Sequence, residues 1–252
     1  DALRIENLQV QNDRGTPAVK GIDLTVKEGE ILGIAGVAGN GQSELVESVT
    51  GMRKIEGGKL SILGEDMTDA SPRKIIEKDV AYIPEDRRKV GICEGLPVAE
   101  NAILKNYNEE PFCTYKTLDH SVITSHADEL VSKHEAKVPD LWKTESRILS
   151  GGNIQRLILA RELASNPRLI IAMHPTHGLD PRGARYTHEQ FLKAKNNGAG
   201  ILLVSEDLDE VLELSDRIAV MFEGKIIETV DADEAEKDRI GRLMTGTKVD
   251  AK

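Results

Sequence analysis

The stretch Gly36-Val37-Ala38-Gly39-Asn40-Gly41-Gln42-Ser43 decides how this chain folds. It follows a largely apolar run at 30–35 and precedes an amphipathic segment at 44–49, which predicts a strand, a glycine-rich loop and a helix. In the order GxxxxGK[ST], such a loop cradles phosphate because backbone N–H groups and the helix N-terminus converge on one anion.

Gln42 departs from that pattern. It stands where a lysine ammonium would reach the terminal phosphates, whereas Ser43 retains the hydroxyl that would contact Mg²⁺. Two interpretations follow: an altered phosphate site, or a turn that only joins strand to helix. The three glycines and Ser43 favour phosphate contact.

Length, composition and charge restrict the class of protein. The 252 residues, 39% of them apolar, suit one large domain or one domain with an inserted subdomain. The longest apolar runs, such as 157–160 and 169–173, are too short to cross a bilayer, so a membrane role would come through a partner. The net charge of −10 argues against a nucleic-acid partner. Cys93 and Cys113 lack a CxxC or paired-histidine context, which indicates free thiols.

Two regions differ in pattern from the rest of the chain. Residues 1–29 and 57–66 contain short strand patterns separated by turn residues, which predicts a small antiparallel β subdomain. Residues 95–147 are more polar and have apolar residues at helical spacing, notably at 99–105 and 121–134. This second region predicts a helical subdomain inserted in an α/β core.

Continuous apolar runs alternate with helical patterns in the remainder, as buried parallel strands and their helices do. Strands are predicted at 79–84, 169–173, 201–205, 217–222 and 225–230, and helices at 153–164, 183–196, 207–214 and 232–244.

A second motif, Leu149-Ser150-Gly151-Gly152-Asn153, lies directly before a predicted helix. A serine hydroxyl, two glycines and a helix N-terminus form an anion-binding surface, although alone they would indicate only a capped helix. Here the motif lies between the glycine loop and a buried strand followed by His174-Pro175-Thr176-His177-Gly178-Leu179-Asp180. This order of glycine loop, serine-glycine motif and buried strand is much more specific than the serine-glycine motif alone.

Together these motifs resemble the nucleotide-binding domain of ABC transporters, over essentially the whole chain. The resemblance implies a P-loop NTPase of ABC type, with a mixed α/β sheet core, an antiparallel β subdomain and an inserted helical subdomain, in one domain spanning 1–252. It implies that 36–43 is the Walker A loop and 149–153 the signature. Gly178-Leu179-Asp180 looks like the D-loop, and Ile83-Pro84-Glu85 like the start of the Q-loop.

Several positions depart from the family pattern. Met173 and His174 replace the Mg²⁺ aspartate and the catalytic glutamate, Glu206 falls where the switch histidine is usual, and Glu85 replaces the Q-loop glutamine. His174 could accept a proton during hydrolysis. The alternative is that His174 is only a polar residue that caps the end of the strand. Glu85 or Glu206 could offer Mg²⁺ a carboxylate, or could simply be a solvated acid. Losing the lysine would weaken ATP binding about ten- to a hundred-fold.

This pattern is similar to the C-terminal domain of the tandem ATPases that serve bacterial simple-sugar and nucleoside importers, in which "GVAGNGQ", "IPEDR" and "LSGGN" occur together. The loss of both carboxylates at 172–175 favours the nucleoside branch. The resemblance implies a second nucleotide-binding domain, upstream in the same native chain, and transmembrane permease subunits as partners. It implies a peripheral location at the cytoplasmic side of the inner or plasma membrane.

The expected function is to supply the signature to a partner domain's ATP site, with this domain's own site a poor ATPase. His174 and Glu206 occupy the altered catalytic positions, and Ser43 and Glu85 are the expected Mg²⁺ contacts. The expected ATP-binding residues are Gly36, Gly39, Gly41, Gln42, Ser43, Glu44, Glu85, Ser150, Gly151, Gly152, Asn153 and Asp180. Alternatives are a non-catalytic nucleotide-binding scaffold and a soluble, non-transport ABC protein.

Other polar clusters are expected to be solvated. His120, His126 and His134 are too loosely spaced for a metal set. The run 87–89, Arg-Arg-Lys, is most simply a charged surface loop.

Overall fold

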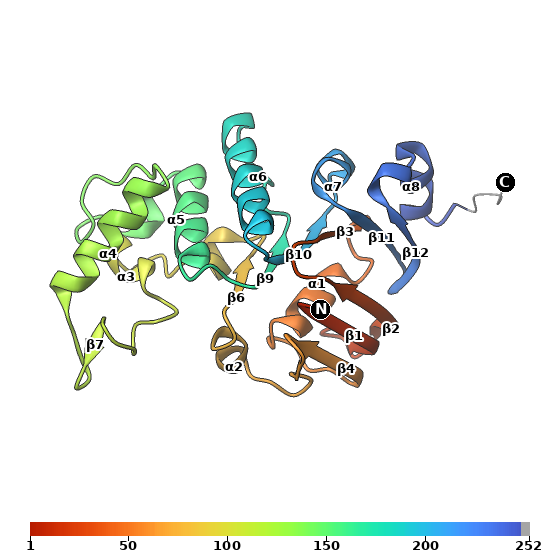
Figure 1. Ribbon diagram of the computed structural model, residues 1–252, viewed down its shortest axis with the longest axis horizontal. Coiled ribbons are helices and arrows are strands. Elements are labelled where there is room, and N and C mark those ends of the chain that lie inside the picture. Colours follow the sequence, from red (N-terminus) through yellow and green to blue (C-terminus); the bar gives the residue numbers. More distant parts are fainter. Residues whose placement is uncertain (248–252) are drawn as a thin grey trace. The chain divides into compact units, whose positions relative to one another are not determined.

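The computed structural model describes residues 1–247 (Figure 1). The predicted domain extends to residue 252, so its last five residues lie outside the described part. The chain divides into two compact units, which are described separately. The first contains Asp1–Tyr82, Asn166–His174 and the chain from Phe191 onward, and the second contains Ile83–Ser165 and Pro175–Gln190.

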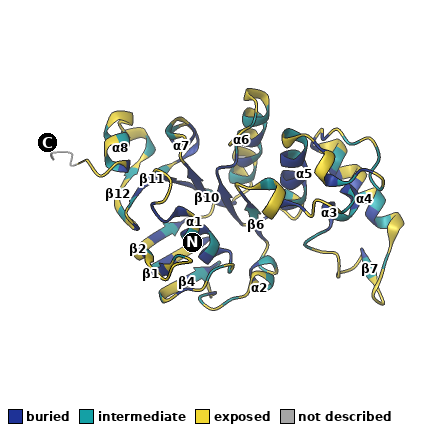
Figure 2. Cartoon of the chain, turned by 180° about the vertical axis from the view of Figure 1, so that it is seen from behind, coloured by how far each residue is buried: buried dark blue, intermediate teal, exposed yellow. Residues whose placement is uncertain are grey.

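A six-stranded sheet forms the centre of the first unit, in the order β12-β11-β3-β10-β9-β6. The strands are β3 (Ile31–Ala35), β6 (Val80–Ile83), β9 (Leu169–Met173), β10 (Gly200–Ser205), β11 (Arg217–Phe222) and β12 (Lys225–Asp231). β3 pairs in parallel with β10 and β11, and β10 pairs in parallel with β9, whereas β11 and β12 form an antiparallel hairpin. Every residue of β3, β9 and β10 is buried, as continuous apolar runs predict (Figure 2).

A second sheet in this unit is antiparallel, in the order β2-β1-β4-β5. Its strands are β1 (Leu3–Gln11), β2 (Pro17–Val26), β4 (Gly57–Ile62) and β5 (Glu65–Asp66). Helix α1 (Gln42–Val49) buries Leu45, Val46 and Val49 in the same apolar core as the inner faces of both sheets. The fold class is therefore confirmed: a mixed α/β core with an antiparallel β subdomain.

Helices cover the C-terminal part of the first unit. α7 (Leu208–Leu214) packs on β3 and β10, and α8 (Lys237–Met244) packs on β11 and α7. A separate apolar cluster that contains Val211, Ile218 and Ile240 fills this region. The predicted helix 232–244 is wrong in its first part, since a 3₁₀ turn at Ala232–Glu234 precedes α8. A short helix α2 (Pro72–Ile76) begins with proline after the capping Ser71.

The second unit is mainly helical, as the pattern at 95–147 predicts. Its elements are α3 (Val98–Ala102), α4 (His120–Lys133), α5 (Gly151–Leu163), the π-helical turn η1 (Arg87–Gly91), the 3₁₀ turn η2 (Ser146–Ile148), and the hairpin of β7 (Cys113–Thr114) and β8 (Thr117–Leu118). α6 (Pro181–Asn196) begins here. Among residues 1–247, no helix is both long enough and apolar enough to cross a membrane.

Two histidines expected to face solvent are covered, His134 fully and His126 in part. His134 is 4% exposed, and its Nδ1 lies 2.7 Å from the Tyr186 hydroxyl, while its carbonyl oxygen accepts a bond from Arg156. His126 is half-buried against the Phe112 ring, and burial lowers the pKa of this imidazole. The expectation of solvent exposure is therefore wrong for these two, because their partners are distant in sequence.

Candidate functional site

The glycine loop joins β3 to α1 as the sequence predicts, and packing requires glycine at two of its positions, Gly36 and Gly41. A Cβ on Gly36 would lie 2.6 Å from Nε2 of Gln42 and 2.8 Å from the Met221 carbonyl oxygen. A Cβ on Gly41 would lie 2.4 Å from the Ala18 carbonyl oxygen, and Gly41 has φ +101°. These positions therefore admit no larger residue without a shift of the backbone.

Gln42 points into the loop. Its side chain is 3% exposed, and Nε2 donates a 3.1 Å hydrogen bond to the Val37 carbonyl. Asn40 Nδ2 donates to the same carbonyl, and Asn40 Oδ1 accepts from the Glu223 N–H at 2.8 Å. The loop is thus held by its own amides and by the β11–β12 turn. Ser43, by contrast, is exposed at the start of α1.

The two altered catalytic positions contact each other. His174, at φ +43°, follows β9, and its N–H donates to the Val204 carbonyl at 2.8 Å. Its Nδ1 accepts a 3.3 Å bond from the Glu206 N–H, so the neutral ring carries its proton on Nε2. His174 is 9% exposed. Its two hydrogen bonds connect the end of β9 to the end of β10. The Glu206 residue itself is exposed.

The metal position has little to offer a cation. Met173, at the expected aspartate position, is buried and apolar. Within the part of the chain that the structure describes, no three His, Cys, Asp or Glu side chains gather closely enough to hold a metal ion. The residues present therefore fit a nucleotide phosphate, through loop N–H groups and the Ser43 hydroxyl, better than they fit a protein-held Mg²⁺.

The signature forms the beginning of α5, within the second unit. Ser150 is the N-cap residue, and its Oγ accepts a 3.4 Å bond from the Asn153 N–H. A Cβ on Gly151 or Gly152 would meet no other described group within 4 Å. In contrast to Gly36 and Gly41, these two glycines are not required by the packing of this chain. Ser150 and Gly151 are exposed at this helix N-terminus, which favours an anion.

Three further predicted residues have partners within the second unit. Asn153 Oδ1 accepts a 3.0 Å bond from the Lys137 N–H. Asp180 Oδ1 accepts one from the Gly183 N–H at 3.2 Å, at the start of α6. Glu85 is exposed, 3.8 Å from Nδ1 of His177. The start of α6 explains the Asp180 bond, whereas the Asn153 side chain holds a backbone group 16 residues earlier in the chain. The Glu85 and Asp180 residues are both exposed.

Arg87 also belongs to this region, which its place in a charged run does not predict. Its Nε donates to Gln155 Oε1 at 2.8 Å, and Nη2 donates to the carbonyls of Pro175 and His177. Gln155 is 1% exposed and donates to the Pro175 carbonyl at 2.9 Å. Burial lowers the pKa of the Arg87 guanidinium. The solvated-loop prediction is thus wrong for Arg87, which fastens the segment after β9 to α5.

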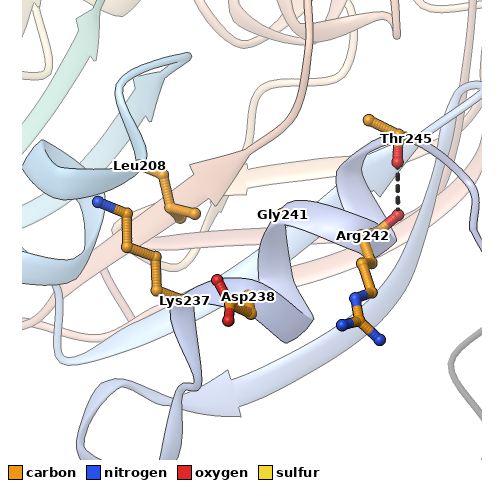
Figure 3. A pocket seen from close by; sticks show the side chains of 6 residues that line it. All are labelled: Leu208, Lys237, Asp238, Gly241, Arg242 and Thr245. Carbon is orange, nitrogen blue, oxygen red and sulfur yellow. Dashed lines mark hydrogen bonds between the residues drawn. The ribbon is translucent and has the colours of Figure 1, made fainter.

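A surface hollow of about 520 Å³ between α7 and α8 is separate from these residues. The Lys237 and Arg242 side chains there do not point toward one another (Figure 3), and Lys237 is paired with Asp209. Its lining is Leu208, Lys237, Asp238, Gly241, Arg242 and Thr245. The hollow contains no predicted site residue, so it is not the candidate site.

The fold and motifs define an ATP-binding cassette domain. The family model for ABC transporters matches residues 19–177, and the chain belongs to that family. A nucleotide-free ATP-binding cassette from an ABC transporter has the same fold, with a TM-score of 0.77 and 24% identity over 96% of this chain and 94% of that chain.

Relatives with named functions are similar along nearly the whole chain. The glucose import ATP-binding protein TsgD13 of Haloferax volcanii is 42% identical over 97% of this chain and 44% of its own length. The guanosine import ATP-binding protein NupO of Bacillus subtilis is 40% identical over 98% of this chain and 48% of its own. The nucleoside import ATP-binding protein NupA of Lactococcus lactis is 41% identical over 97% of this chain and 48% of its own length. The chain spans about half the length of these relatives.

Proposed function

We propose that this chain is an ATP-binding domain of an import system for simple sugars or nucleosides, and that it supplies its signature to a partner domain's ATP site. In this proposal, residues 1–252 form one nucleotide-binding domain whose own site is weakly hydrolytic or inactive. The observation that carries the proposal is the contrast between the two motifs: Gln42 is bonded inside its own loop, while Gly151 and Gly152 face open space.

The state of its own site supports weak binding. A neutral amide replaces the phosphate-contacting ammonium, and its donor is bonded to the Val37 carbonyl. Ser43 and the loop N–H groups remain, so ATP would bind through the backbone, with Mg²⁺ held by Ser43 and the phosphates. Glu44 would lie beside them at the start of α1.

Hydrolysis at this site lacks its usual groups. A positioned general base contributes about 10²–10⁴-fold to rate, and Nδ1 of His174 already accepts a backbone hydrogen bond. Met173 supplies no metal ligand. The proposed site is therefore a nucleotide-binding or structural site with little turnover of its own.

The partners follow from the divided roles. A signature that acts on a nucleotide held elsewhere requires a second nucleotide-binding domain, which we place upstream in the same native chain because relatives are about twice as long. Transmembrane permease subunits would bring this domain to the cytoplasmic face of the membrane. The relatives named above include both glucose and nucleoside importers, and the loss of both carboxylates at 172–175 supports the nucleoside class.

The experiment is to mix this chain with a nucleotide-binding domain of the same system that has an intact GxxxxGK[ST] loop. The chain alone is expected to turn over ATP slowly, and the mixture faster. Ser150→Arg would place a long side chain at the open helix start and should prevent the gain, whereas Glu145→Gln, before the motif, should not. Stimulation unaffected by Ser150→Arg would reject the proposal.

The same mixture separates the alternatives. A non-catalytic scaffold would bind the partner domain, but the partner's turnover would be the same with wild-type and Ser150→Arg chains. A soluble, non-transport ABC protein would gain ATPase activity on addition of nucleic acid, in a sequence-independent and salt-sensitive way.

A further inference from the structure

The charged segment after β6 is an ordered π-helical turn, Arg87–Gly91. Asp86 Oδ1 accepts bonds from the Lys89 N–H at 3.0 Å and the Arg88 N–H at 3.2 Å, and the Asp86 carbonyl accepts from the Gly91 N–H. These backbone bonds, that of Lys89 first, lower the pKa of the Asp86 carboxyl. A cap that is charged at neutral pH therefore holds the backbone of this turn.

Both ends of this turn are fastened to α5, the helix that the signature begins. Gly91 packs directly on it, since a Cβ there would lie 2.4 Å from Cδ1 of Ile158. Arg161 Nη2 donates to the Gly91 carbonyl at 2.8 Å, and at the other end Arg87 Nε donates to Gln155 at 2.8 Å. The turn and the helix therefore form one rigid support.

Arg88 extends from this support to the chain that enters the signature. Its Nη1 donates to the Arg147 carbonyl at 2.8 Å, and Nη2 donates to the Leu149 carbonyl at 3.1 Å. The Leu149 carbonyl belongs to the peptide unit that leads into Ser150. Nη1 also pairs with Glu94 at 3.4 Å. A planar guanidinium thus holds two carbonyls at alternate residues, 59 and 61 positions further along the chain.

We propose that Arg88 is a positioning residue for the signature: it fixes the Leu149–Ser150 peptide, and through it the N-cap and the N–H groups at the start of α5. The proposal rests on the proposed function, since it concerns the geometry that the signature offers to a partner's nucleotide. A lysine has one ammonium in place of the fork and cannot hold both carbonyls in the same way.

The test compares wild type with Arg88→Ala, Arg88→Lys and Lys89→Ala in the complete native protein. Lys89 is the matched control, because it is the neighbouring cation on the same turn and its Nζ lies 3.6 Å from Oδ2 of Asp86, at the start of that turn. Hydrogen exchange of the amides at 150–154 measures the positioning itself. ATP turnover in the assembled transporter, separated into kcat and KM, measures its consequence.

Arg88→Ala should speed exchange at 150–154 about three- to ten-fold, since a charge-assisted bond is lost at a side chain that is 45% exposed. It should lower kcat by a similar factor and leave KM for ATP unchanged, because the partner's own loop binds that nucleotide. Arg88→Lys should give exchange rates and kcat values between those of wild type and Arg88→Ala. Lys89→Ala should give wild-type values.

Exchange at 150–154 that is no faster in Arg88→Ala than in Lys89→Ala overturns the positioning role, and so does a loss confined to KM. Ser150→Arg is measured in parallel. If Ser150→Arg leaves turnover intact, the proposed function fails, whereas the exchange result still decides whether Arg88 fixes the loop.

Discussion

Replacing Gln42 with lysine is expected to tighten ATP binding about ten-fold. The ammonium would contribute a charge-assisted contact to the phosphates of about 1.5–3 kcal/mol. The bond between Gln42 Nε2 and the Val37 carbonyl, 3.1 Å long and buried, is missing from the variant both with and without ATP, so its loss of about 0.5–1.5 kcal/mol lowers the free energy of unfolding and does not enter the dissociation constant. A gain at the lower end of the range for the contact, about 1.5 kcal/mol, corresponds to roughly ten-fold in the dissociation constant.

Isothermal titration with ATP and with AMP provides the assay. A lysine at this position reaches the β- and γ-phosphates, so the gain should be seen with ATP and not with AMP. Gln42→Met is the matched control, because it keeps the length of the side chain, removes the bond to Val37 and adds no charge. It should bind ATP no more tightly than wild type.

Equal ATP affinity for wild type and Gln42→Lys, with both proteins folded, would refute the view that the missing ammonium weakens this site. An equal gain with AMP would show that the lysine acts away from the terminal phosphates.

Three further outcomes follow from the packing. Gly36→Ala should destabilise the fold by about 1–3 kcal/mol in urea unfolding, because its Cβ would lie 2.8 Å from the Met221 backbone carbonyl oxygen, whereas Gly152→Ala should change stability by less than about 0.5 kcal/mol. Arg87→Ala should cost about 2 kcal/mol through the lost carbonyl bonds, seen as a lower urea midpoint with an unchanged slope. Burial raises the pKa of Tyr186 to about 12, so the neutral phenol is favoured in the folded state. Its contribution to stability is complete below about pH 10 and is lost as pH rises through about 12, which Tyr186→Phe should abolish in alkaline unfolding curves.

Local patterns predicted much of the architecture. The continuous apolar runs at Leu169–Met173 and Gly200–Ser205 became buried parallel strands, because burial on both faces leaves no room for polar alternation. Ser150 with two glycines predicted a capped helix start, and the structure places Ser150 at the N-cap of α5. These predictions needed only neighbours within one element.

Predictions failed where the partner lies far along the chain. The run at 87–89 reads as a solvated loop because charged side chains mostly face solvent, yet Arg87 donates to a carbonyl 90 residues away. His134 is buried, and its Nδ1 is hydrogen-bonded to the hydroxyl of Tyr186, 52 residues away. Gln42 marked the departure from the loop pattern, but only the geometry revealed that its amide bonds the loop itself.

The central claim is that this domain contributes a signature rather than a hydrolytic centre. The most direct measurement is steady-state ATP turnover of the complete native protein in its transporter, compared between Ser150→Arg and His174→Ala. We expect Ser150→Arg to abolish most turnover and His174→Ala to leave it near wild type. Turnover lost in His174→Ala and retained in Ser150→Arg would contradict the claim.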